Sequence, residues 1–170
     1  MVQYTINYFR QIRKKYGNGR DRRTEIRNFD TIIATKVVAT NQKLYVNWKE
    51  GFFGTSLKKD DYICDCSDID DIITIRKDGG CMATRVADKV FAGKDIIHIA
   101  VFKKSDTRTI YNIVYLDGKT GNAMMKRCPI LGITRDKEYY LTKNNSSSKI
   151  LYLSVNPNGE AEVVKVFLKP

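Results

Sequence analysis

The chain has 170 residues, of which 42% are hydrophobic and 29% charged, a composition typical of one soluble globular domain and not of a disordered chain. Its 30 Lys and Arg outnumber its 19 Asp and Glu, and the resulting net charge of +11 attracts polyanions, nucleic acids first. The sequence contains no apolar run of about 18 residues and no apolar signal core at its start. We therefore expect a cytoplasmic protein with no membrane partner.

Residues 2–16 have the pattern of a helix. Val2, Ile6, Phe9 and Tyr16 recur at helical spacing, and Gly17 is a plausible end for the element. Because a single helix of this length is only marginally stable in water, we expect it to pack on the rest of the protein or to be the end of a longer helix.

A basic, glycine-containing linker follows at residues 17–27. The planar guanidinium of arginine binds phosphate in a bidentate manner, so a cluster of arginines in a flexible loop suits a nucleic-acid backbone. The alternative is a solvated linker whose arginines pair with Asp21 and Glu25. The arginines expected to contact phosphate are Arg20, Arg22 and Arg23. We predict one unit at residues 1–27 and a β domain at residues 28–170.

The rest of the chain reads as β structure. Residues 31–40 are rich in Ile, Val and Thr, which predicts a first strand buried on both faces. Four strand-turn-strand patterns follow, each with a Gly in the turn that can supply positive φ. Their turns are Glu50-Gly51, Asp78-Gly79, Asp117-Gly118 and Asn158-Gly159. Such repetition predicts an all-β, propeller-like array of hairpin blades, about four in number.

Cations recur at similar places in these repeats. Lys49, Arg76, Lys77 and Lys119 stand at or beside the turns. The strands that return from the last three turns carry Arg85, Lys126, Arg127 and Lys165, and one further loop carries Lys103, Lys104 and Arg108. If rotation relates the blades, equivalent positions share a rim. The pattern then predicts a curved strip of cations that contacts double-stranded DNA and bends it.

Other chemistry finds little support in the sequence. His98 stands between Ile97 and Ile99, which favours a structural histidine, and Cys64 and Cys66 are too close together for a usual zinc site. The aspartate-rich residues 60–71 do not fit the EF-hand template. Gly118-Lys119-Thr120 lacks the P-loop context. We therefore expect no catalytic residue, no metal site and no cofactor.

Several motifs together resemble the C-terminal domain of bacterial type IIA DNA topoisomerase A subunits, the family that includes the A subunits of topoisomerase IV and of DNA gyrase. They are residues 43–46 (Lys-Leu-Tyr-Val), 50–60 (Glu-Gly-Phe-Phe-Gly-Thr-Ser-Leu-Lys-Lys-Asp), 68–73 (Asp-Ile-Asp-Asp-Ile-Ile), 89–96 (Lys-Val-Phe-Ala-Gly-Lys-Asp-Ile), 109–112 (Thr-Ile-Tyr-Asn), 132–139 (Gly-Ile-Thr-Arg-Asp-Lys-Glu-Tyr) and 156–161 (Asn-Pro-Asn-Gly-Glu-Ala). The resemblance implies a β-pinwheel, in which neighbouring blades exchange a strand and DNA binds a basic rim.

The resemblance also implies partners and a role. The helix at residues 2–16 would lead out of the DNA-cleavage core, and the partners would be the remainder of the A subunit, together with the ATPase B subunit. The catalytic tyrosine and the ATPase of the ATP-dependent enzyme would lie outside this chain, which would itself be no enzyme.

Two departures from the family pattern shape the expectation. The Gln-Arg-Arg-Gly-Gly-Lys-Gly box of gyrase-type domains does not occur, which favours a domain like that of topoisomerase IV. Four hairpins are fewer than complete pinwheels have, so we expect a truncated array that need not form a closed ring. The alternatives are a propeller-like scaffold for protein interactions and an RNA-binding β module, which would need exposed aromatic side chains.

Overall fold

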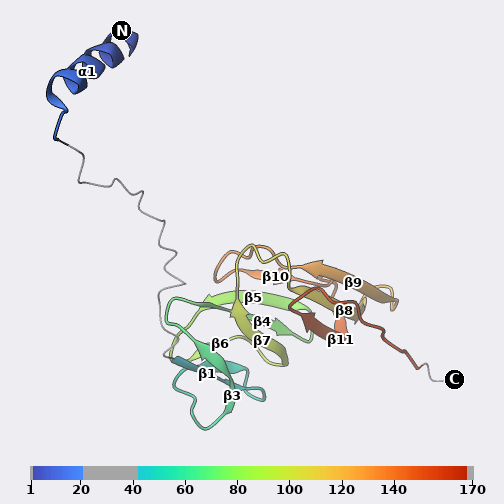
Figure 1. Cartoon of the computed structure of the whole chain (residues 1–170). Coiled ribbons are helices and arrows are strands. Elements are labelled where there is room, and N and C mark those ends of the chain that lie inside the picture. The colour runs from blue at the N-terminus through green and yellow to red at the C-terminus, as the bar shows by residue number, and fades with distance from the viewer. Residues whose placement is uncertain (1, 21–41, 168–170) are drawn as a thin grey trace. The chain divides into compact units, whose positions relative to one another are not determined.

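The structure is a computed structural model that describes residues 2–20 and 42–167. The chain divides into two compact units, Met1–Ile33 and Ala34–Pro170. The described part of the first unit is one helix and that of the second is all β (Figure 1). The expected strand at residues 31–40, the predicted boundary after residue 27, and Arg22 and Arg23 lie outside the described residues.

Helix α1 spans Val2–Tyr16, as its spacing predicts. Gly17 follows its last turn, and the amide of Gly17 donates to the Arg13 carbonyl at 2.8 Å. A Cβ at Gly17 would lie 2.4 Å from that carbonyl oxygen, so a larger residue would disturb this end of the helix. Arg13, Lys14 and Lys15 crowd the last turn, where the helix dipole favours positive charge.

The described part of the second unit contains three antiparallel sheets, which we call blades 1, 2 and 3 (Figure 1). Blade 1 has the strand order β3 (Asp61–Cys66), β1 (Gln42–Asn47), β2 (Phe52–Gly54) and β6 (Val90–Phe91). Blade 2 has the order β7 (Ile96–Phe102), β4 (Asp71–Arg76), β5 (Gly80–Arg85) and β10 (Glu138–Tyr140). Blade 3 has the order β11 (Lys149–Asn156), β8 (Ile110–Leu116) and β9 (Ala123–Pro129).

Neighbouring blades exchange strands. After the hairpin β4–β5 of blade 2, the chain returns to blade 1 and adds β6 beside β2. After the hairpin β8–β9 of blade 3, it returns to blade 2 and adds β10 beside β5. Each return is followed by a strand, β7 or β11, that pairs with the first strand of its own hairpin. This exchange is the one expected of a β-pinwheel.

The core consists of two apolar layers between successive blades. Leu44, Val46 and Phe53 of blade 1 pack on Ile72 and Ile99 of blade 2. On the other face of blade 2, Ile73, Ile75 and Cys81 pack on Tyr111 and Ile113 of blade 3. Strand β4 is therefore buried on both faces, which explains its unbroken run of β-branched residues.

Blades 2 and 3 can be aligned residue by residue. The ladder between β4 and β7 shifts register after Ile75, and the ladder between β8 and β11 shifts between Val114 and Tyr115. Ile75 pairs with Cys81 and Val114 pairs with Met125. Met125 of blade 3 therefore corresponds to Cys81 of blade 2. Phe53 of blade 1 corresponds to Cys81 as well, because each lies two residues after a glycine, Gly51 or Gly79, whose carbonyl accepts a hydrogen bond from the loop after the exchanged strand.

Three of the four predicted hairpins form, and the fourth does not. Residues 157–167 contain no strand, although a returning strand was predicted at residues 163–166. Strand β11 corresponds to β3 of blade 1 and β7 of blade 2, each of which pairs with the first strand of its own blade's hairpin. After β3 and β7 the chain passes to the hairpin of the next blade, so neither strand forms a hairpin with the residues that follow it. The described residues thus contain three blades, and the prediction of about four is wrong for this part of the chain.

The turns also differ in detail from the prediction. Three residues join β4 to β5, with positive φ of 92° at Gly79, so the loop is not a two-residue primed turn. In blade 3 the positive φ falls on Gly121 and not on Gly118. Gly118 is needed for space instead, because its Cβ would lie 1.8 Å from the Ser146 carbonyl oxygen.

Candidate nucleic-acid interface

Each exchanged strand, β6 or β10, passes beside the hairpin loop of the blade that it joins. The amide of Ala92, after β6, donates to the Gly51 carbonyl at 2.9 Å, and that of Leu141, after β10, donates to the Gly79 carbonyl at 2.8 Å. A Cβ on Gly51 would lie 2.1 Å from the Gly93 carbonyl oxygen, so this approach requires glycine. These hydrogen bonds hold the loop after each exchanged strand at the turn end of the blade that the strand joins.

This packing brings lysines together at the turn ends. Lys49 lies in the turn of blade 1, beside the loop that carries Lys94, and Lys77 lies in the turn of blade 2, beside the loop that carries Lys143. Lys119 lies in the turn of blade 3. We call Lys49, Lys77, Lys94, Lys119 and Lys143 the turn-end lysines. All five are exposed, and none forms an ion pair within 4.0 Å with another described residue.

Lys94 and Lys143 occupy the same place in two repeats. Each precedes a residue with a left-handed backbone, Asp95 with φ of 59° and Asn144 with φ of 55°. Reasoning from the sequence missed both lysines, because Gly93-Lys94-Asp95 and Thr142-Lys143-Asn144 share only the lysine. The tolerance of Asp and Asn for this backbone conformation is the one signal that could have linked them.

Other predicted site residues lie at the opposite ends of the strands. Arg85 pairs in the ladder with Asp71, five residue pairs from the turn, which is roughly 17 Å at the usual rise of a strand. The other exposed members of this group are Lys103, Lys104, Arg108 and Arg127, and we call the five the opposite-end cations. The structure thus divides the predicted residues between two ends of the blades.

Arg76 is engaged within blade 2. Its Nη2 lies 3.0 Å from Asp78 Oδ2 and 2.5 Å from Glu138 Oε1, so it joins β4 to the exchanged strand β10. Burial alone would lower the pKa of Arg76, but hydrogen bonds to Asp78 and Glu138 raise it above its usual value. Burial likewise acts to raise the pKa of Asp78, but the hydrogen bond from Arg76, hydrogen bonds from backbone amides and the charge of Arg76 together lower that pKa. The contacts of Arg76 assign it to strand exchange.

A second ion pair, in addition to those of Arg76, holds the loop that precedes β10. Arg135, which the sequence reasoning did not single out, donates to both oxygens of Asp71 at 2.8 and 3.1 Å. The corresponding loop before β6 is held differently, since Thr55 and Ser56 donate side-chain hydrogen bonds to Asp88. Both exchanged strands are thus fastened to a neighbouring blade by polar contacts as well as by their ladders.

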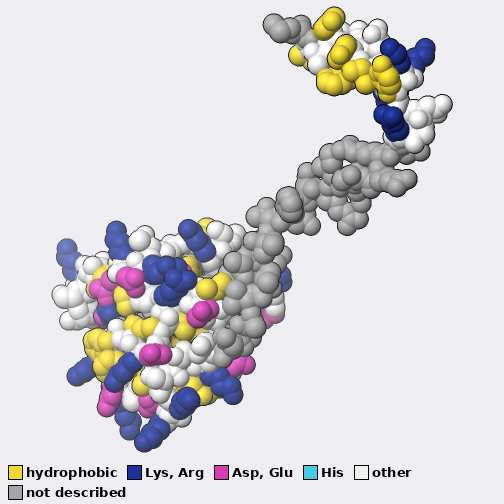
Figure 2. All heavy atoms as spheres, turned by 90° about the vertical axis from the view of Figure 1, so that its left-hand side faces the viewer, with side chains coloured by type: hydrophobic (Ala, Val, Ile, Leu, Met, Phe, Trp, Pro, Cys, Tyr) yellow, Lys and Arg dark blue, Asp and Glu magenta, His cyan; other side chains and the backbone are white. Residues whose placement is uncertain are grey.

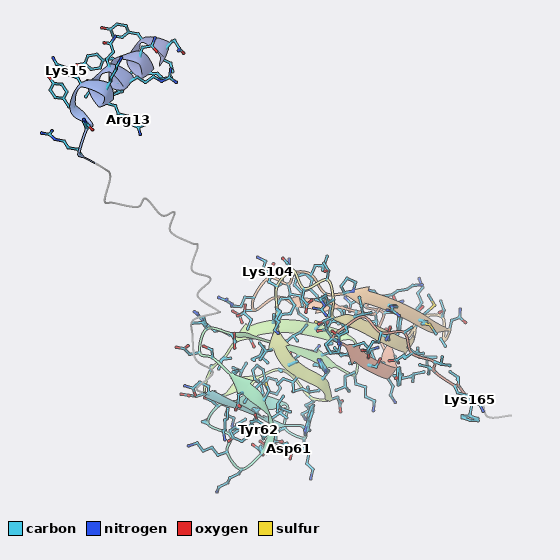
Figure 3. All side chains as sticks on the ribbon, in the orientation of Figure 1. Arg13, Lys15, Asp61, Tyr62, Lys104 and Lys165 are labelled. Atoms are coloured by element: carbon cyan, nitrogen blue, oxygen red, sulfur yellow. The ribbon has the colours of Figure 1, made fainter. Side chains whose placement is uncertain are left out.

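The remaining predicted cations differ in their surroundings. Lys126 Nζ lies 3.4 Å from the Leu141 carbonyl, and Arg127 Nη2 donates to the Gly159 carbonyl at 2.7 Å. Lys165 lies over the Phe167 ring, on the C-terminal segment and apart from Lys104 (Figure 3). Arg20 is exposed in the first unit, after helix α1.

Two cavities lie near the opposite-end cations. One of about 490 Å³ is lined by Lys103, Arg108, Tyr111 and His98 among others. The other, of about 470 Å³, is lined by Lys104, Arg135 and Tyr139 among others. Burial lowers the pKa of His98, so its imidazole is neutral at pH 7, and its buried Nε2 has no hydrogen-bond partner among the residues that the structure describes.

Charge is spread unevenly over the β unit. On the face in Figure 2, Lys and Arg side chains lie around the periphery with Asp and Glu between them. Asp61 and Tyr62 belong to the aspartate-rich region, and Lys104 lies on the far side of the β unit from them (Figure 3). Glu50 and Asp95 are exposed near the turn-end lysines and reduce their positive field.

The described residues hold no group of three or more His, Cys, Asp or Glu placed to bind a metal ion. Nor does the described part of the chain include a helix that is long and apolar enough to span a membrane. Burial raises the pKa of the Cys81 thiol to about 12, so this cysteine is protonated and packs as a small apolar side chain.

The chain belongs to a family of topoisomerase C-terminal domains. Residues 43–169 match the family described as "Topoisomerase C-terminal domain, Bacteroidota". The chain is also 27% identical, over 155 residues, to the A subunit of DNA topoisomerase 4 from Borreliella burgdorferi. That match covers 91% of this chain and 24% of the relative, so the chain spans about a quarter of the relative's length. No solved structure matches the chain.

Proposed function

We propose that the β unit is a non-catalytic module that binds and bends double-stranded DNA within a type IIA topoisomerase. The observation that carries the proposal is the recurrence of exposed lysines at equivalent turn ends of successive blades. Repeated cations spaced along an array suit the regular spacing of phosphates on a duplex, and they carry no sequence information. Family membership and the net charge of +11 support the same conclusion.

Bending follows if contacts continue from one blade to the next. Bending a short duplex costs about 1–6 kcal/mol by elastic estimates, and additional phosphate contacts can offset that cost. In this role the domain would position a duplex for strand passage. The absence of the gyrase box favours a domain like that of topoisomerase IV. Its partners would be the remainder of the A subunit, together with the ATPase B subunit, in the bacterial cytoplasm.

Binding can be measured by fluorescence anisotropy with a duplex of arbitrary sequence over a series of salt concentrations. We expect affinity at low salt, similar for unrelated sequences, with log K falling by about 0.9 per log unit of salt for each phosphate neutralised. A chain that does not bind duplex at low salt would refute the proposal. DNA circularisation then tests bending, through shortened circles or a change in linking number.

Two matched variants test the interface, because each removes five positive charges. The first combines Lys49→Gln, Lys77→Gln, Lys94→Gln, Lys119→Gln and Lys143→Gln. The second combines Arg85→Gln, Lys103→Gln, Lys104→Gln, Arg108→Gln and Arg127→Gln. If the turn-end lysines contact phosphate, the first variant loses up to about 4–5 units of salt slope and the second loses fewer. Equal losses would mean that net charge alone decides binding.

A further inference from the structure

The cavity of about 490 Å³ lies between blades 2 and 3. Its walls come from β7 of blade 2, from β8 and the end of β11 in blade 3, and from the loop between β7 and β8. Cavities that bind small ligands in proteins have volumes of about 300–1,000 Å³, so this one is large enough. The proposed contacts between phosphates and the turn-end lysines do not involve it.

The interior of this cavity combines apolar walls with two neutral polar rings. Ala100, Val101 and Ile130 contribute apolar surface, and the rings of His98 and Tyr111 lie edge to face with centroids 6.0 Å apart. Burial lowers the pKa of His98 and raises that of Tyr111 to about 12, so both rings are neutral at pH 7. Neither side chain forms a hydrogen bond with another described residue, and because Nε2 of His98 is buried, Nδ1 is the ring nitrogen open to a ligand.

Two cations border the same cavity. Lys103 and Arg108 both line it, both are exposed, and neither forms an ion pair within 4.0 Å with another described residue. Arg108 Nη2 donates to Asn158 Oδ1 at 2.9 Å, which orients the guanidinium and leaves further N–H groups for a ligand. The mouth of the cavity is therefore suited to an anion, and to phosphate in particular.

Asp106 is the one acidic residue among those that line the cavity. Its carboxylate is already engaged, since Thr109 Oγ1 donates to Oδ2 at 2.7 Å and the amide of Arg108 donates to Oδ1 at 2.9 Å. The hydrogen bond from the Thr109 side chain and that from the Arg108 amide lower the pKa of Asp106, so it is charged and shapes the loop that carries Lys103 and Arg108. Two cations against one carboxylate leave the cavity a net charge of +1.

We propose that this cavity binds a nucleoside monophosphate, with the phosphate on Lys103 and Arg108 and the base in the apolar interior. A flat base packs against the apolar walls and exchanges hydrogen bonds with the Tyr111 hydroxyl or the His98 ring. Inorganic phosphate uses only the mouth and a nucleoside uses only the interior, so each binds more weakly than the two joined. A free nucleotide and an unpaired nucleotide at the end of a DNA strand both offer this chemistry.

The His98 ring is a direct probe of the cavity, because it is the only histidine of the chain and its NMR signals need no separation from others. The titration uses the intact chain and dAMP without duplex DNA, so its failure is distinct from that of the proposed function. We expect the ring signals to shift saturably with a Kd below about 1 mM. Deoxyadenosine and inorganic phosphate, titrated separately, should each bind at least about tenfold more weakly.

A second arm distinguishes the two sources of the nucleotide. It compares a duplex that has an unpaired 5′-phosphorylated adenosine at each end with the same duplex made blunt. A shift of the His98 signals with dAMP assigns the cavity to free nucleotides, and a shift with the overhanging duplex alone assigns it to strand ends. No shift with dAMP and no difference between the duplexes would overturn the proposal, as would inorganic phosphate that binds as tightly as dAMP.

Two matched variants separate the cavity from the net charge of the chain. Arg108→Gln removes one positive charge from the mouth, and we expect it to weaken dAMP binding by about tenfold. Lys59→Gln removes one positive charge from an exposed residue of blade 1, which does not line the cavity, and it should leave dAMP binding unchanged. Equal weakening by the two variants would mean that net charge alone attracts dAMP, and it would overturn the proposal.

Discussion

Blades 2 and 3 have the same strand plan but different surroundings. Blade 2 is packed on both faces, and its hairpin has a neighbouring strand on each side. Blade 3 is packed on one face only, and one edge of its hairpin is unpaired among the described residues. Corresponding residues therefore differ in burial because of their neighbours and not because of their strand. The comparison teaches that stability in this array depends on contacts between successive blades.

The largest expected effect is at the centre of blade 2. Ile75→Ala removes a fully buried side chain between blades 2 and 3 and should lower the free energy of unfolding by about 2–4 kcal/mol. Val114→Ala, at the corresponding position of blade 3, should cost less than about 1 kcal/mol, because its side chain is only partly buried. Urea denaturation measures both. Equal losses would contradict the difference in burial between the two positions.

A second pair of variants extends the comparison to the returning strands. Cys81→Ser places a hydroxyl in an apolar layer and should cost about 1–3 kcal/mol, since the group gains no assured hydrogen-bond partner. Met125→Ser should change stability by no more than about 0.5 kcal/mol, as exposed substitutions usually do. Thermal unfolding compares the two, and a large loss for Met125→Ser would mean that this face is covered in solution.

The ion pair between Arg76 and Glu138, which joins blade 2 to its exchanged strand β10, should contribute less to stability. Glu138→Gln weakens the contact with Arg76, while Asp78 remains as a partner, so we expect a loss of roughly 1 kcal/mol. Backbone amides of β10 should exchange with solvent faster, because Glu138 lies in β10 and its ion pair with Arg76 helps to hold this strand on blade 2. Glu160→Gln is the matched control on an exposed residue. Unchanged exchange in β10 would show that its ladder alone holds the strand.

The local sequence was sufficient to predict the hairpins and insufficient to predict their partners. Asp78-Gly79 between β-branched runs identifies β4 and β5, because turn and strand preferences act over a few residues. The same reasoning failed at Asn158-Gly159, where β11 pairs with β8 across 33 or more residues and not with the segment that follows. Local apolar alternation does not say which strand a segment will meet.

The candidate site has the same dependence on distant contacts. The sequence predicted Lys49, Lys77 and Lys119 as members of the candidate site, since they lie within the turns themselves. It did not identify Lys94 or Lys143, which reach the turn ends only through strand exchange. The sequence analysis also proposed Arg76 as a phosphate contact. Its ion-pair partner Glu138 lies 62 positions further on, and nothing near Arg76 in the sequence indicates this pairing.

The smallest expected effect concerns the C-terminal segment on blade 3, and it depends on pH. Glu162 accepts hydrogen bonds from Ser154 at 2.5 Å, Tyr152 at 2.6 Å and Asn156 at 3.0 Å. These bonds lower the pKa of Glu162 from its ordinary value of 4.5 to about 2. The attachment of the segment is therefore fully present above pH 4.5 and is lost as pH falls from about 4.5 towards 2.

Carboxyl chemical shifts recorded over this pH range measure the effect directly. An attached segment should give a titration midpoint for Glu162 near pH 2, and a detached one should give a midpoint near 4.5. The hydrogen bond to Glu162 also raises the pKa of Tyr152. Glu162→Gln should abolish the acid-dependent detachment and lower the pKa of Tyr152 towards its usual value.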